Sequence, residues 1–223
     1  MNVSFDVLNL ADSGFPTGAH GHAAGLEYAI QAGWVTDRAS FSAWAASALE
    51  RSVMTLDLRA AVQAWLAGEG EDPQALWRVL NNQVAAFRTS RVQREASAQV
   101  GRSFLRSVGS CYGDRALGLP QPSGADSVQA PVAWGAAFRV LGLPVKAMAE
   151  TLVFGALRQW TMAVIRVLPL GQKDAFAAQT EVLASLVWPD LETEAARPLE
   201  TFAPGLELAG LGQGNLARKY FRS

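Results

Sequence analysis

The sequence predicts an all-α, single-domain helical bundle with a flexible C-terminal tail. Alanine and leucine recur at spacings of three and four residues along most of the chain, which is the pattern of amphipathic helices. Runs in which β-branched and polar residues alternate, as they do in strands, are scarce. The chain has 223 residues, enough for one sizeable core and short for two. We therefore expect residues 1–223 to form one domain.

Start and stop signals place the helices of the first half. Residues 21–32 put His22 and Leu26 on one apolar stripe, and Gly33 stands where the helix should stop. Residues 38–67 continue the helical spacing as one long helix or two. Asp72 and Pro73 then form a strong start signal. The helix that they begin could run to residue 108, with a possible break near Thr89.

The second half begins with a long loop over residues 113–131, which is rich in proline and glycine. Three helices should follow and pack as antiparallel neighbours, over residues 132–141, 144–168 and 173–187. The most apolar stretch is 151–170. Because Arg158 and Arg166 interrupt it, we interpret it as a buried helix and expect no membrane span.

Composition narrows the classes of function. Half of the residues are apolar and 17% are charged, with a formal net charge of -1. A chain so near neutrality is unsuited to nucleic acid, since phosphate binding depends on an excess of Lys and Arg. The single cysteine, Cys111, cannot form a disulfide within the chain, and the N-terminus lacks the pattern of a signal peptide. We expect a cytoplasmic protein with apolar surface available to a permanent partner.

The only two histidines, His20 and His22, lie in a glycine-rich segment, residues 12–27. This segment lacks the lysine and hydroxyl residue of a phosphate-binding loop. The two histidines are weak candidates for a metal site, because a stable site needs three or four protein ligands. The alternative is that they form hydrogen bonds in the core or at an interface. No nucleophile with a neighbouring base is evident, so we expect no catalytic residue, no bound cofactor and no enzymatic activity.

A second candidate site is a basic helical face. If the helix is continuous, the side chains of Arg88, Arg91, Arg102 and Arg106 fall in one sector, opposite Phe104. One interpretation is a solvated face on which Arg91 pairs with Glu95. The other is a docking face for an acidic partner surface. Under the second interpretation, Arg88, Arg91 and Arg102 are candidates for partner binding.

The third candidate is the end of the chain. Residues 190–207 are acidic and are expected to form a weakly structured linker. The last residues reverse the sign of the charge and can form a short amphipathic helix, which should be loosely packed until a partner covers it. The candidate partner-binding residues there are Leu216, Arg218, Lys219, Tyr220, Phe221, Arg222 and Ser223.

Four short motifs, in order along the chain, resemble those of the UreF family of urease accessory proteins. The first comprises Asp12, Ser13, Pro16, Gly18, His22, Gly25, Leu26 and Glu27, and the second comprises Arg94, Glu95, Ser97, Gly101 and Arg102. The third is Pro169-Leu170-Gly171-Gln172, and the last is Lys219-Tyr220-Phe221-Arg222-Ser223. The chain departs from the family pattern at Ala19-His20, at Gln129 and at Gln213-Gly214.

The resemblance implies an all-α, non-enzymatic chaperone subunit for nickel delivery to apo-urease. In that role the protein bridges the accessory protein UreD, also called UreH, to the GTPase UreG, which carries the metal. It would help to couple GTP hydrolysis to nickel transfer, act as a homodimer within the complex, and contact UreD through residues 216–223. Two alternatives stay open: a nickel carrier that uses His20 and His22, and a UreF-like interaction protein with another role.

Overall fold

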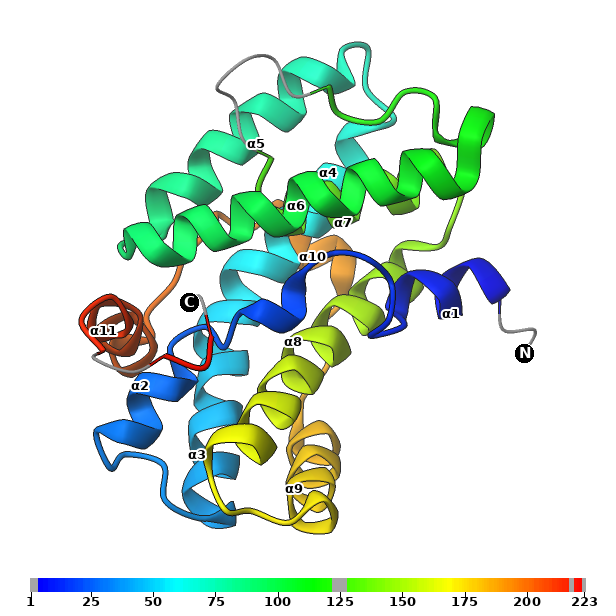
Figure 1. The fold of residues 1–223 in the computed structure, drawn as a ribbon. Coiled ribbons are helices and arrows are strands. Elements are labelled where there is room, and N and C mark those ends of the chain that lie inside the picture. The colour runs from blue at the N-terminus through cyan, green and yellow to red at the C-terminus, as the bar shows by residue number, and fades with distance from the viewer. Residues whose placement is uncertain (1–3, 122–127, 217–218, 222–223) are drawn as a thin grey trace.

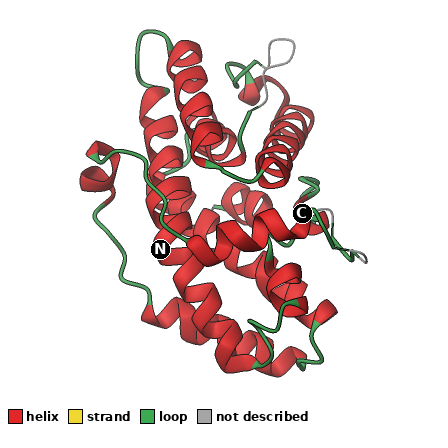
Figure 2. Ribbon diagram, turned by 90° about the vertical axis from the view of Figure 1, so that its left-hand side faces the viewer, coloured by secondary structure: helices red, strands yellow, loops and turns green. Residues whose placement is uncertain are grey.

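The computed structural model describes residues 4–121, 128–216 and 219–221. Within these ranges every regular element is a helix and no strand occurs (Figure 2), which confirms the all-α class. The helices surround one continuous cluster of buried apolar side chains. In the part of the chain that is described, no helix has the length and apolarity needed to cross a membrane.

The first elements are short. The helix α1 (Phe5–Ala11) is followed by a 3-10 turn, η1 (Ala19–Gly21), and by α2 (Leu26–Gln31). The helix α2 begins later than the predicted residue 21, because Ala24 and Gly25 have φ values of 49° and 89°, outside the range of a right-handed helix. Gly33, with a φ of 76°, stops α2 as predicted.

The predicted long helix is one continuous helical run with an unusual middle. It comprises α3 (Arg38–Ala48), the π-helix η2 (Leu49–Leu58) and α4 (Arg59–Ala67). The start is fixed by Asp37, whose carboxylate accepts a hydrogen bond from Ser40 N at 2.8 Å. A π-helix of this length is rare, and wide helical turns often occur at functional sites. The wide turns of η2 therefore make it a candidate functional element.

The next two helices confirm the predicted break near Thr89. The helix α5 (Pro73–Phe87) ends before Arg88, and α6 (Arg91–Tyr112) begins after it. Asp72 caps α5 by accepting a hydrogen bond from Ala75 N at 3.0 Å. Ser90 caps α6 through the N–H of Gln93. The 3-10 turn η3 (Gly113–Ala116) follows α6.

The remaining helices build two halves of the bundle (Figure 1). The helix α7 (Ala130–Val140) packs mainly against α4 and α6 in the upper half, and less against α8 (Val145–Val167). The helix α8 lies across the lower half with α2, α3 and α9 (Gln172–Ser185). The prediction that the last three helices are neighbours holds for the pairs α7–α8 and α8–α9. The closer partner of α7 is α4, because its buried small residues allow a close approach: a Cβ on Gly135 would lie 2.1 Å from Ala61 O.

The segment predicted as a weakly structured acidic linker is partly helical and packed. It contains α10 (Leu191–Ala196) and the first turn of α11 (Pro204–Gln213). Glu194 is 6% exposed because it pairs with a buried arginine of α4, as described below. The helix α11 lies beside α2 at one edge of the molecule, close to the C-terminal end of the described chain (Figure 1).

Candidate functional site

The glycine-rich segment folds as a series of tight turns against the bundle. Gly14 N donates to Asp12 Oδ1 at 2.6 Å, and Ala19 N donates to Thr17 Oγ1 at 3.2 Å. His22 is 5% exposed, and its carbonyl oxygen accepts a hydrogen bond from Gln159 Nε2 at 2.6 Å. The segment therefore packs onto α8 as a structural element, which agrees with the expectation that His22 faces the core or a partner.

His20 and His22 made this segment a weak candidate for a metal site. Among the described residues, no group of three or more His, Cys, Asp or Glu side chains could hold a metal ion. The side chain of His20 lies outside what the structure describes. Cys111, the only thiol, is exposed at the end of α6.

The first motif ends in a buried carboxylate that joins the two ends of the chain. Glu27, on α2, is fully buried. Its Oε1 accepts hydrogen bonds from Tyr220 N at 2.7 Å and from Gln31 Nε2 at 3.4 Å. Its Oε2 accepts hydrogen bonds from Gln213 Nε2 at 2.9 Å and from Phe221 N at 3.1 Å. All four of these donors are neutral amides, so the carboxylate is stabilised by hydrogen bonds in place of water.

Gln213, one of the departures from the family pattern, completes this junction. It is 1% exposed, and its Oε1 accepts a hydrogen bond from Tyr28 N at 3.2 Å. Its amide group thus donates to Glu27 and accepts from the first turn of α2 at the same time. Gly212 and Gly25 let α11 approach α2 closely: a Cβ on Gly25 would lie 2.9 Å from Gly210 N.

The tail residues divide into buried and exposed ones. Phe221 is 5% exposed, and the guanidinium of Arg166 lies 5.9 Å from the centre of its ring. The expectation that the whole tail is loosely packed is therefore wrong for Phe221, because the pocket that buries it belongs to the same chain. Tyr220 is 72% exposed, Lys219 is exposed, and Leu216 is half-buried. Arg218, Arg222 and Ser223 lie outside the described residues.

The predicted basic face is interrupted. Arg88 lies in the break between α5 and α6, and its Nη2 donates to Asp57 Oδ1 of η2 at 2.5 Å. It therefore does not extend the face, and the prediction that it lines up with the arginines of α6 is wrong. Arg91 is exposed and paired with Glu95 at 2.7 Å, and this pairing raises the pKa of its guanidinium. Arg102 and Arg106 are exposed on the same helix.

The second motif has a structural role. Arg94 Nη1 donates to Arg88 O at 2.5 Å and to Thr89 O at 3.1 Å, which fixes the turn before α6. Ser97 Oγ accepts a hydrogen bond from Ala130 N at 3.1 Å. A Cβ on Gly101 would lie 2.0 Å from Val128 O. These residues hold the segment that leads into α7 against α6.

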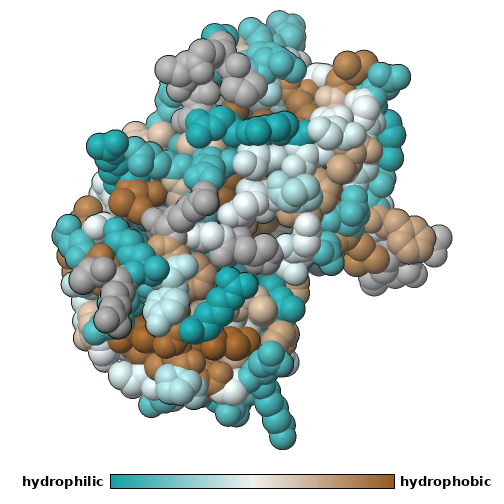
Figure 3. Space-filling model, viewed as in Figure 1, coloured by the Kyte–Doolittle hydropathy of each residue, from teal (hydrophilic) through white to brown (hydrophobic). Residues whose placement is uncertain are grey.

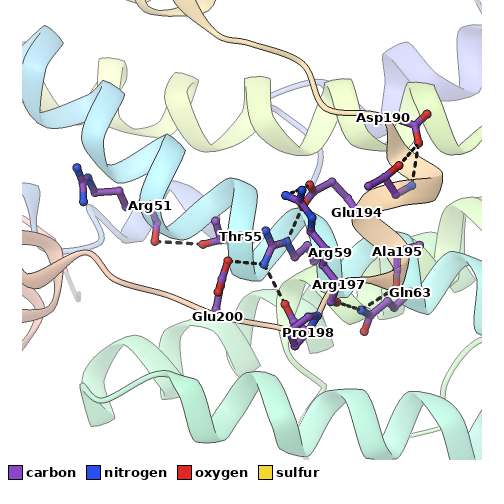
Figure 4. Close-up of polar contacts among 11 residues, drawn as sticks. Arg51, Thr55, Arg59, Gln63, Asp190, Glu194, Ala195, Arg197, Pro198 and Glu200 are labelled. Carbon is purple, nitrogen blue, oxygen red and sulfur yellow. Dashed lines mark hydrogen bonds and ion pairs between the residues drawn. The ribbon is translucent and has the colours of Figure 1, made fainter.

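A buried arginine anchors the acidic segment, and sequence reasoning missed it. Arg59, the first residue of α4, donates from Nε to Glu194 Oε2 at 2.5 Å (Figure 4). Its Nη1 donates to Glu200 Oε1 at 2.7 Å and to Pro198 O at 2.9 Å. Burial opposes ionisation of Arg59, but the hydrogen bonds and charges of the two glutamates outweigh it, so the pKa of the guanidinium is raised.

A cavity of about 290 Å³ lies where the two halves of the bundle meet. Its lining is mixed, with the apolar side chains of Leu56 and Trp134 beside the polar side chains of Ser52 and Thr89. The first motif contributes His22 to the wall. The cavity thus touches the N-terminal turns, η2, the turn between α5 and α6, α7, α8 and α11.

Apolar side chains also remain on the surface. Phe202, Leu208 and Leu211 are 71%, 57% and 52% exposed, at or just before α11. Figure 3 shows a face of the molecule on which a band of apolar side chains crosses the lower half among polar ones. Surface of this kind is typical of proteins that bind partners.

The molecule is thus an all-α bundle in which motifs from the two ends of the chain meet at one buried carboxylate. A family model described as UreF matches residues 35–183. The urease accessory protein UreF of Paenarthrobacter aurescens is 30% identical over 96% of this chain and 95% of its own length. The chain belongs to the UreF family.

Other members give similar values. The urease accessory protein UreF of Methylobacterium radiotolerans is 34% identical over 78% of this chain and 73% of its own length. The protein of the same name from Azorhizobium caulinodans is 31% identical over 89% of this chain and 81% of its own length. The family model matches residues 35–183. This range includes neither Glu27 nor the tail residues that donate hydrogen bonds to it.

Proposed function

We propose that this protein is a non-enzymatic scaffold of urease maturation that bridges UreD and the GTPase UreG. In this role it helps to couple GTP hydrolysis to the transfer of nickel, the cargo, to apo-urease. We further propose that residues 1–223 act as one domain, as a homodimer within the complex, in the cytoplasm. The observation that carries the proposal is the match to UreF proteins over nearly the whole chain.

The structure supports a partner-binding role in two places. The exposed arginines of α6, Arg91 and Arg102, offer a basic surface to an acidic partner. At the other place, Tyr220 is 72% exposed beside the buried Phe221, so the tail can present a side chain to UreD while it stays attached to its own chain. Lys219 is exposed there as well.

Reconstitution tests this proposal directly. The purified chain, mixed with UreD and UreG, should form a complex that elutes as one species in size-exclusion chromatography. Expressed in a urease-producing host that lacks its own UreF, it should restore urease activity in the presence of nickel. A chain that neither joins the complex nor restores activity would contradict the proposal and favour a UreF-like protein with another role.

The nickel-carrier alternative has a separate test. Two histidines supply too few ligands for a tight site, so the isolated protein should bind Ni²⁺ or Zn²⁺ no tighter than about micromolar in isothermal titration. The variants His20→Ala and His22→Ala should titrate like the unaltered chain. A stoichiometric nanomolar site that either substitution abolishes would establish the carrier instead.

A further inference from the structure

The cavity between the two halves of the bundle is open to solvent. Four of the residues that line it, Asp12, Ser13, Phe87 and Thr89, are exposed, so small solutes can reach it from outside. Its volume of about 290 Å³ is at the lower end of the range for ligand pockets, roughly 300–1,000 Å³. The cavity therefore has the access and the size that suit a small molecule.

Small residues of α8 leave this space empty. Leu152, Gly155, Ala156 and Gln159 line the cavity, and their spacing places them on one face of the helix. In the middle of this face, nothing beyond the local backbone lies within 4 Å of the place that a Cβ on Gly155 would occupy. Packed helices usually fill such a place with a side chain. A ligand can therefore occupy the space beside Gly155 without moving the protein.

The walls are largely apolar and are held in place by the surrounding structure. Trp134 Nε1 donates to Thr151 Oγ1 at 3.3 Å, and its ring stacks on that of Phe104 with the centroids 4.3 Å apart. The ring of Trp160 packs edge to face against that of Trp44, at 5.1 Å. Walls that are already ordered favour binding, because little side-chain freedom is lost when a ligand enters. The apolar side chains of the lining include those of Leu10, Val53, Leu56, Trp134, Leu152 and Trp160.

Ser52, in η2, offers the cavity a hydrogen-bond donor. It lines the cavity and is 7% exposed. Thr55, three residues later, donates from its hydroxyl to Arg51 O at 3.1 Å. By contrast, no residue that the structure describes forms a hydrogen bond with the hydroxyl of Ser52. This hydroxyl is therefore available to an oxygen acceptor in the cavity.

The charged residues of the lining disfavour an anion. Arg88 pairs with Asp57. The guanidinium of Arg158 lies over an aromatic ring of α9, 4.4 Å from its centre, and α9 contributes nothing to the lining. Asp12 and Glu207 remain, and an anion would meet their negative charge. Because neither is buried, water solvates both carboxylates and they offer little to a cation. A neutral ligand fits this lining best.

We propose that the cavity is a binding site for a small neutral molecule with an apolar body and a carbonyl group, which accepts a hydrogen bond from Ser52. The apolar body lies against η2, α7 and α8, beside Gly155. This inference concerns the cavity alone and does not depend on the proposed role in urease maturation.

Titration with prodan, a neutral naphthalene that carries one ketone, tests the proposal in the full-length chain. The fluorescence of prodan shifts to the blue when it leaves water. We expect one saturable site and a rise in melting temperature, because a ligand that binds only the native state stabilises it. Gly155→Leu fills the empty space and should weaken binding at least about tenfold. Gly109→Leu is the matched control. It lies at an equally open place on α6, outside the cavity lining, and should leave the affinity unchanged.

A second variant tests the hydrogen bond. Ser52→Ala removes the donor and should weaken the binding of prodan about three- to tenfold. It should leave unchanged the binding of 2-dimethylaminonaphthalene, which is the same ring system without the ketone. If Gly155→Leu fails to fold, this comparison decides alone: a loss confined to prodan supports the proposal, and equal effects on both probes refute it.

Three other results would overturn the proposal. The first is the absence of saturable binding. The second is an unchanged affinity in a folded Gly155→Leu variant. The third is a loss of binding in Leu211→Ser, which alters the exposed apolar surface of α11 outside the cavity lining, because the probe would then bind that surface.

Discussion

Glu27 and Phe221 lie 194 positions apart in the chain, yet the backbone N–H of Phe221 donates to Glu27 Oε2 at 3.1 Å. Tyr220 N donates to the other carboxylate oxygen at 2.7 Å. The motif at the start of the chain and the motif at its end are thus two halves of one junction. A buried carboxylate that accepts from backbone amides fixes the path of the tail, since side-chain substitutions in the tail do not remove those donors.

The first prediction is that Glu27→Gln destabilises the fold. The substitution keeps the shape but places an amide N–H₂ group against donors that the carboxylate now satisfies. We expect the free energy of unfolding in urea to fall by about 2–3 kcal/mol, because buried donors lose their acceptor. Glu95→Gln, in an exposed pair with Arg91, is the control and should have no measurable effect. Equal stability of both variants would show that the junction contributes nothing.

The second prediction separates the stability of the tail from its proposed binding role. Phe221→Ala removes a side chain that is 5% exposed, and should lower the free energy of unfolding by about 3 kcal/mol. Tyr220→Ala removes a side chain that is 72% exposed and should leave stability unchanged while weakening binding to UreD. Urea unfolding and pull-down measure the two effects. A stable Phe221→Ala variant would mean that the tail is not docked in solution.

Local patterns predicted the helices well because their start and stop signals act within a few residues. Asp72 and Gly33 each fix a helix end through the backbone next to them. The anchoring contacts of the site were not predictable in this way. Glu194 looked like one of many solvated acids, since its partner Arg59 lies 135 positions away. No local spacing contains such a pair.

The same reasoning explains what was missed in the motifs. The position of Glu27 after Gly25 and Leu26 marked it as part of a motif. Nothing nearby in the sequence indicated that its carboxylate oxygens accept hydrogen bonds from the tail. The basic face was predicted for a continuous helix, and the break at Arg88 turned one of its members toward Asp57 of η2. The direction in which the break turns Arg88 depends on how η2 packs against it, and no local sequence pattern contains that contact.

The third prediction concerns the arginines that remain on that face. If Arg91 and Arg102 dock an acidic partner, the double variant Arg91→Glu, Arg102→Glu should weaken complex formation with UreG and UreD, because like charges would then meet. The effect should be larger at low salt, and the far-UV circular dichroism should not change. Arg78→Glu, which reverses an exposed charge on α5, is the matched control. Undiminished binding of the double variant at both salt levels would identify a solvated face.

The fourth prediction follows from the partial burial of Asp57, whose side chain is 19% exposed. Burial raises the pKa of its carboxyl above the ordinary 3.8, although the charge and hydrogen bond of Arg88 lower it. The native state then keeps a proton that the unfolded state has lost, so the stability that this group contributes is complete below pH 3.8 and is lost as the pH rises through the folded pKa. Asp57→Asn should therefore gain stability relative to the unaltered chain as the pH rises from about 4 to about 7.

Asp37 provides a control of opposite sign. Hydrogen bonds from the backbone and side chain of Ser40 lower the pKa of its carboxyl below 3.8. Its stabilising effect is therefore present at neutral pH and is lost as the pH falls through the folded pKa. The stability difference between the unaltered chain and Asp37→Asn should shrink in acid, as measured by urea unfolding across the pH range. Parallel pH profiles for the two variants would contradict the assignment of Asp57.

The last prediction compares two glycines of α6. A Cβ on Gly101 would lie 2.0 Å from Val128 O and 3.0 Å from the carbonyl carbon of Gln129. Gly101→Ala must push the segment before α7 away from α6. This movement lengthens or breaks the hydrogen bond from Ala130 N to Ser97 Oγ. We expect the free energy of unfolding to fall by about 1–3 kcal/mol.

Gly109 is the matched control on the same helix. No atom lies within 4 Å of the place that a Cβ on Gly109 would occupy, so Gly109→Ala should stabilise α6 by about 0.5–1 kcal/mol, because alanine loses less backbone entropy on folding than glycine. Urea unfolding of both variants measures the difference, and a Gly101→Ala variant as stable as Gly109→Ala would show that α6 and the segment at residues 128–130 do not touch in solution.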